Sequence, residues 1–179
     1  MIFLLRILLL MVVLAPAWAG NSIAILDRYA LVIEHGAVAP SHRLALVLAY
    51  FEDSWTPETI RSAVRKGAQI LAQCGVEIAK AELVRLDAPA FEAEAVGRGN
   101  SATRPELKDT VWVARGARDL EIVLAHELVH VLMDSGDHSD EARNLMREDT
   151  APGNTRLDDA QYSWLRATAT ANGLLRPVR

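Results

Sequence analysis

One strongly apolar segment, residues 119–133, constrains the fold of this chain because it contains His126, Glu127 and His130 among its apolar side chains. The segment is predicted to form a buried helix, and Asp119 is placed to act as its cap. Polar groups buried in such a helix are costly when they lack a partner. Metal ligation would give the two imidazoles a reason to be inside the protein.

The spacing of the two histidines supports a shared metal ion. His126 and His130 are four residues apart, which on a helix is a rotation of about 40°, so both imidazoles leave the same face one turn apart. Glu127 lies one position along and can reach a water molecule on that ion. This H-E-x-x-H pattern is typical of zinc hydrolases with two histidine ligands and a glutamate general base.

A catalytic zinc ion usually has three protein ligands and one position open for water. His138 is the candidate third ligand, because zinc favours imidazole and because Gly136 would let the chain turn back sharply after the helix. Carboxylate alternatives stay open at Asp134, Asp137, Glu141 and Glu148.

The stretch HELVHVLMDSGDHSDEARNLM, residues 126–146, resembles the metzincin zinc peptidases, and most of all their matrixin-type sequences. Those proteins carry H-E-x-x-H, a third histidine, and a methionine in a tight turn beneath the metal. The matching positions here are His126, Glu127, His130, His138 and Met146. The resemblance implies zinc as the cofactor, Glu127 as the general base and a structural role for Met146.

This sequence departs from the family pattern at two points. Seven residues separate His130 from His138, where the family pattern has five, and Met133 occupies the usual position of the turn glycine. We interpret them as a two-residue extension around the helix end, in which Gly136 serves as the turn glycine.

The preceding sequence predicts a strand, a helix and a strand. Residues 43–51 form a short apolar run typical of a buried strand, and residues 29–38 could form another, with a turn at Gly36. A helix is expected over residues 56–75, capped by Thr56, with buried positions at helical spacing. A strand over residues 76–87 would complete a parallel crossover. The buried helix positions are Ile60, Ala63, Val64, Gly67, Leu71 and Cys74.

Later segments complete an α/β (α+β) domain. Residues 88–109 are expected to be loops with one short strand, and residues 109–115 read as a further strand. Residues 157–173 predict a C-terminal helix that stops at Asn172 and Gly173. The family resemblance implies a zincin fold: a mixed twisted sheet with a long backing helix, an active-site helix and a C-terminal helix. It places the substrate-binding edge strand between Ala88 and Val113, and the pocket loop between Arg147 and Arg156.

The N-terminus predicts export. Residues 1–19 contain Arg6, a leucine-rich run and the small residues Ala17 and Ala19, the layout of a secretory signal peptide cleaved after Ala19. The apolar run is short for a bilayer span, which needs about 20 residues. We therefore expect a single catalytic domain over residues 20–179, secreted or periplasmic, with no stable membrane association after cleavage.

Net charge bears on the class of binding partner, and cysteine content bears on disulfide bonding. Without Arg6 the chain has 18 basic and 23 acidic residues, a net charge of −5, which does not favour nucleic acid. Cys74 is the only cysteine, so no intrachain disulfide can form, and it is expected in the core.

Together these features predict a zinc endopeptidase that acts on peptide or protein substrates. Two alternatives stay open. One is a zinc peptidase with Glu141 or Glu148 as the third ligand, and the other is a non-catalytic zinc-binding scaffold.

Overall fold

The computed structural model describes residues 24–33, 39–51, 55–87, 97–98, 111–113 and 117–178. The elements along the chain are β1 (Ala24–Leu31), β2 (His42–Phe51), α1 (Pro57–Ala72), β3 (Val76–Asp87), β4 (Gly97–Arg98), β5 (Val111–Trp112), α2 (Leu120–Met133), α3 (Asp159–Ala171) and β6 (Leu175–Pro177). The expected signal peptide, residues 1–19, and the turn expected at Gly36 lie outside the described residues. In the described part of the chain, no helix has the length and apolarity needed to cross a membrane.

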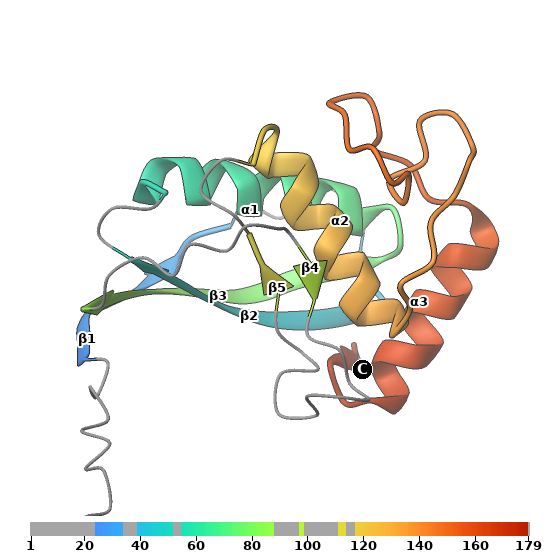
Figure 1. The fold of residues 1–179 in the computed structure, drawn as a ribbon. Helices are drawn as coiled ribbons and strands as arrows, with labels where there is room; N and C mark the ends of the chain where they lie inside the picture. Colours follow the sequence, from blue (N-terminus) through green and yellow to red (C-terminus); the bar gives the residue numbers. More distant parts are fainter. Residues whose placement is uncertain are drawn as a thin grey trace, which may run out of the picture.

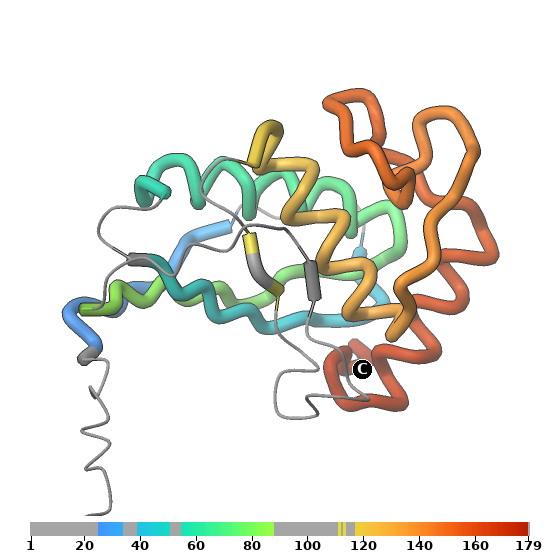
Figure 2. The backbone as a smooth tube through the Cα atoms, viewed as in Figure 1, coloured from blue at the N-terminus to red at the C-terminus, as the bar shows by residue number. Residues whose placement is uncertain are grey.

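A four-stranded mixed sheet carries the helices, which confirms the predicted α+β class. Its strand order is β1-β3-β2-β6, with β2 and β3 parallel and joined through α1, as the predicted crossover requires. The outer strands β1 and β6 run antiparallel to their neighbours. Helix α1 packs along the sheet, and α2 packs against both α1 and α3 (Figure 1; Figure 2 traces the same backbone as a tube).

Helix α1 begins as the sequence predicts. The Thr56 side chain accepts a hydrogen bond from the Thr59 backbone N–H at 3.2 Å, and Pro57 occupies the first turn. All six predicted core positions of this segment are buried. Cys74 is fully buried, which confirms that it is a core residue, and its burial raises the pKa of the thiol to about 12.

Strand β3 spans the predicted residues, and β2 begins one residue earlier than predicted. The expectation of a buried strand holds for one face of β2 only. Leu44 and Tyr50 are buried, but Val47 between them is 68% exposed. Because successive side chains of a strand point to opposite faces, β2 buries one face only.

Helix α2 buries every side chain from Ile122 to Met133 and starts one residue after Asp119. The expected side-chain cap is absent. Asp119 has a left-handed backbone (φ 55°) and its carboxylate makes no capping hydrogen bond, whereas capping side chains normally sit on an extended backbone. Its carbonyl oxygen instead accepts the backbone N–H groups of Ile122 and Val123.

Helix α3 lies within the predicted C-terminal segment and has a complete capping box. The Asp158 carboxylate accepts the Gln161 N–H at 2.7 Å, and the Gln161 side-chain oxygen accepts the Asp158 N–H at 2.9 Å. Leu165 and Ala169 are fully buried. After Gly173 the chain adds β6 to the edge of β2, a strand that the sequence analysis missed.

Gly75 lies in the turn between α1 and β3, and its replacement tests how this turn is stabilised. Its φ is +69°, and a Cβ atom there would lie 2.7 Å from Ser41 Oγ, a hydroxyl that donates to the Gly75 carbonyl oxygen. Gly75→Ala should lower the free energy of unfolding in urea by about 2 kcal/mol, from left-handed strain of about 1–2 kcal/mol and the loss of the Ser41 contact. Gly173→Ala is the matched control, since its φ is +76° and its surroundings are open. Equal losses in the two variants would contradict a role for Ser41.

Candidate metal centre

Helix α2 brings His126 and His130 together, as their spacing predicts. They are 3% and 5% exposed, and their Nε2 atoms lie 2.9 Å apart. Two nitrogens bound to one tetrahedral zinc at 2.0–2.1 Å would be separated by about 3.3 Å. The two imidazoles are therefore already close to the separation that a shared ion requires.

His138 joins this pair from the loop that follows α2. Its ring centroid lies 5.4 Å from that of His126 and 5.0 Å from that of His130. One ligand nitrogen from each ring lies within 4.8 Å of the others. His138 is exposed while the other two rings are buried, so the cluster has one side open to solvent.

The turn that returns the chain to His138 differs from the expected one. Gly136 was expected to provide the sharp turn, but its φ is not positive. Asp134 takes the left-handed conformation instead, with φ 47°, and its N–H binds the carbonyl oxygens of His130 and Val131. Aspartate is among the few non-glycine residues that tolerate this conformation, so the helix ends without a glycine.

The proton positions on both buried rings follow from their partners. His126 Nδ1 lies 2.8 Å from the Leu145 carbonyl oxygen, and His130 Nδ1 lies 2.8 Å from that of Ser135. A carbonyl oxygen can only accept, so each Nδ1 must carry the hydrogen. In a neutral ring, Nε2 then carries the lone pair, which is the form in which histidine binds a metal.

Two such lone pairs at 2.9 Å repel each other unless a positive species lies between them. A proton would turn one ring into an imidazolium, but burial lowers the pKa of His126 and so disfavours the charged form. A metal cation would accept both lone pairs at once and would leave both rings neutral. The donor set therefore fits a metal ion.

The segment from Asn144 to Met146 lies beneath the cluster and supports it through backbone groups. Leu145 and Met146 are fully buried. The Leu145 carbonyl accepts from His126, and the Met146 carbonyl accepts the Ser139 N–H at 2.8 Å. The sequence pointed to Met146 but not to these carbonyl groups. Every residue has a backbone carbonyl, so residue types do not indicate which one accepts a hydrogen bond.

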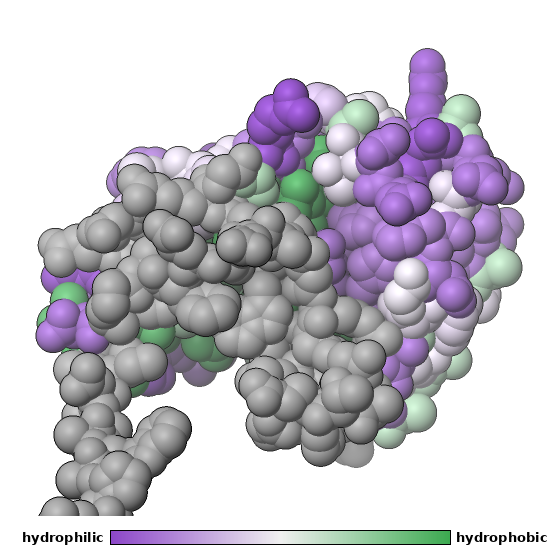
Figure 3. Space-filling model, in the orientation of Figure 1, coloured by the Kyte–Doolittle hydropathy of each residue, from purple (hydrophilic) through white to green (hydrophobic). Residues whose placement is uncertain are grey.

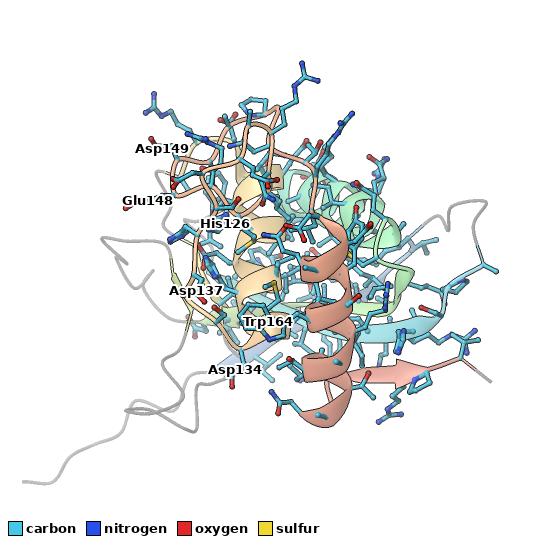
Figure 4. All side chains as sticks on the ribbon, turned by 90° about the vertical axis from the view of Figure 1, so that its right-hand side faces the viewer. His126, Asp134, Asp137, Glu148, Asp149 and Trp164 are labelled. Atoms are coloured by element: carbon cyan, nitrogen blue, oxygen red, sulfur yellow. The ribbon has the colours of Figure 1, made fainter. Side chains whose placement is uncertain are left out.

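The carboxylates considered as alternative ligands do not join the cluster. In the part of the chain that the structure describes, the group of potential ligands that comes together consists of the three histidines alone. The alternatives were Asp134, Asp137, Glu141 and Glu148. Figure 4 shows Glu148 and Asp149 at the outer edge of the loop after Met146, while His126 lies further in. Glu127 is buried in α2, directly after His126, with 7% of its surface exposed.

Strands β4 and β5 and the loop after Met146 lie in the regions where substrate contacts were expected. Strands β4 and β5 pair with each other and contact α2, in the region where the substrate strand was expected; most of residues 88–110 lies outside the description. The expected pocket loop between Arg147 and Arg156 is described throughout. The surface over the segment that follows α2 is largely hydrophilic (Figure 3).

Burial of His126 predicts that the metal-free protein is acid-sensitive. Desolvation holds the pKa of His126 below its ordinary 6.5, with His138 acting in the same direction and the bond to Leu145 opposing both. The unfolded chain therefore binds a proton below pH 6.5 that the folded protein resists, so this contribution to stability is present above that pH and is lost below it. Urea unfolding of chelator-treated protein should show a smaller free energy at pH 5.5 than at pH 7.5. His126→Gln should weaken the dependence; an unchanged pH profile in this variant would contradict the assignment.

Comparison with known proteins adds no relative. No protein-family model matches the chain, and searches of the curated proteins and of the solved structures return no match.

Proposed function

We propose that this chain is a zinc-dependent endopeptidase of the metzincin type. The observation that carries the proposal is the pair of buried imidazoles whose protonated Nδ1 atoms leave two Nε2 lone pairs 2.9 Å apart, with a third imidazole beside them. His126, His130 and His138 are the proposed ligands. The resemblance to matrixin-type sequences supports the same set.

Zinc is the metal that best fits these donors. Imidazole suits zinc, and three histidines with one open position form a recognised catalytic arrangement. Within the described residues, no thiolate or carboxylate belongs to the group, which disfavours the oxygen-rich sites of calcium or magnesium. A structural zinc site is normally closed by a fourth side chain, whereas this group has three members and one of them is exposed.

Glu127 is the proposed general base. Zinc, when bound, would lower the pKa of a water molecule and polarise the carbonyl group of the substrate. The Glu127 carboxylate would take a proton from the attacking water and pass it to the leaving amine. Its position beside His126 in a buried helix suits this role, because a base held next to a ligand lies near the water that the ion would bind.

The arrangement of the elements is consistent with the zincin architecture implied by the resemblance. The mixed sheet carries a long helix, α1, and the candidate ligands lie on α2 and the loop after it. Met146 lies in a buried turn next to the residue that binds His126, and α3 closes the domain. We propose that substrate reaches the exposed side of the cluster at His138. The signal-peptide pattern would place this activity in the periplasm or outside the cell.

The proposal is tested by metal analysis together with peptide-library cleavage. The mature chain, beginning near Gly20, should contain one equivalent of zinc and should cleave peptides internally. A chelator should abolish cleavage, and added zinc should restore it. A protein that retains zinc but cleaves nothing under these conditions would be the non-catalytic scaffold, and the endopeptidase proposal would fail.

A further inference from the structure

We propose that Asn144 is a positioning residue that fixes the orientation of His126 and ties the candidate metal centre to helix α3. This inference rests on the proposed function, because it concerns the residues that would hold the metal. Asn144 lies outside the H-E-x-x-H pattern and is not one of the three proposed ligands. Asn144 is 3% exposed, so its polar groups need partners within the protein.

The side-chain oxygen of Asn144 shapes the turn beneath the cluster. Its Oδ1 accepts the Met146 backbone N–H at 2.8 Å, two residues further along the chain. This short-range bond bends the backbone at Leu145, the residue between them. The Leu145 carbonyl points to His126 Nδ1, also at 2.8 Å. The amide of Asn144 thus determines where the hydrogen-bond partner of His126 lies.

The same turn also binds the loop that carries the third imidazole. The Met146 carbonyl accepts the N–H of Ser139, the residue directly after His138. Asn144 therefore holds a three-residue turn whose carbonyl groups contact both the ligand on α2 and the loop that carries His138. The carbonyl partner of His130 comes from Ser135, outside this turn.

The amide nitrogen of Asn144 connects the turn to α3. Its Nδ2 donates to Gln161 Oε1 at 2.9 Å, the oxygen that also accepts the Asp158 N–H in the capping box. Two backbone bonds reinforce the connection, one from the Leu145 N–H to the Arg156 carbonyl and one from the Arg156 N–H to the Arg143 carbonyl. The cap of the C-terminal helix and the support of His126 therefore form one network.

Loss of the Asn144 side chain should affect His126 more than His130. A hydrogen bond to the second nitrogen of a ligand imidazole fixes its tautomer and ring orientation, and loss of such support typically lowers metal affinity about 10- to 100-fold. Loss of the Asn144 amide should loosen His126 through Leu145 and leave the support of His130 intact. A general loss of stability would affect both rings equally.

Asn144→Ala tests the inference, with Asn154→Ala as the matched control. Asn154 is also buried, at 7% exposure, and its amide donates to the Asp149 carbonyl, outside the turn. Zinc affinity, measured by competition with a chromogenic chelator, should fall about 10-fold or more in Asn144→Ala and stay near wild type in the control. In metal-free protein, hydrogen exchange at Nδ1 of His126 should accelerate relative to that of His130, as observed by NMR with labelled histidine.

Gln161→Ala provides a second variant if Asn144→Ala does not fold. It removes the partner of the Asn144 amide and should give the same selective acceleration at His126, to a smaller extent. Equal acceleration at both rings, or none at either, would overturn the inference. The exchange measurement needs no metal, so it decides the role of Asn144 even if the wild-type protein binds no zinc, a result that would defeat the proposed function alone.

Discussion

Replacing Glu127 with glutamine should lower kcat/KM for peptide cleavage by about 10²–10⁴-fold, the usual contribution of a general base. Glutamine has nearly the same size and can still hydrogen bond, but it cannot accept the proton of the attacking water. Zinc content should remain at one equivalent, because Glu127 is not a proposed ligand. The measurement is steady-state cleavage of a fluorogenic peptide by wild type and variant at matched zinc occupancy.

Glu121→Gln is the control for this experiment. Glu121 lies in the first turn of the same helix and accepts a hydrogen bond from Ser62, away from the histidine cluster. Its replacement should leave kcat/KM close to the wild-type value. Full activity in Glu127→Gln would remove the general base from the proposal, and equal losses in both variants would show that the effect comes from α2 as a whole.

His138→Ala should weaken zinc binding by more than about 100-fold. Removing a metal ligand lowers the affinity more than removing a residue that only hydrogen bonds to a ligand. His138 is exposed, so its removal leaves no buried cavity and the free energy of unfolding of the metal-free protein should change little. Affinity is measured by chelator competition, and stability by urea unfolding without metal. The effect on affinity should therefore appear without a parallel effect on the fold.

Three further variants make this result specific. His42→Ala removes another histidine, whose Nδ1 bonds to Ser41 at the start of β2, and should not change zinc affinity. Glu141→Ala and Glu148→Ala should also leave it unchanged, since neither carboxylate joins the cluster. If a glutamate variant lost zinc while His138→Ala retained it, the third ligand would be a carboxylate and the metzincin assignment would fail.

The sequence predicted much of the fold where local signals were strong. Thr56 and Pro57 marked the start of α1, and the apolar pattern of residues 76–87 marked β3. The exposure of β2 and the existence of β6 could not be predicted, because both depend on tertiary contacts. Val47 is exposed because only one face of β2 is buried, and β6 is a strand only because β2 leaves an edge for it.

The candidate site was predictable in its side chains but not in its backbone. The spacing of His126 and His130 on a helix predicts their approach, since helical geometry alone brings them to one face. The turn at Asp134 was assigned to Gly136, because a left-handed aspartate is less common than a left-handed glycine. The support from Leu145 depends on a carbonyl group, which any residue supplies. Asn144 left a usable signal, because asparagine often binds the backbone two residues ahead.

The most direct test of the account is a crystal structure of the zinc-loaded protein with anomalous scattering measured at the zinc edge. We predict a single strong peak within about 2.0–2.1 Å of Nε2 of both His126 and His130 and of one ring nitrogen of His138, with a water molecule in the remaining position. A peak elsewhere, a His138 ring turned away from the ion, or a protein side chain in the fourth position would contradict the proposed catalytic centre.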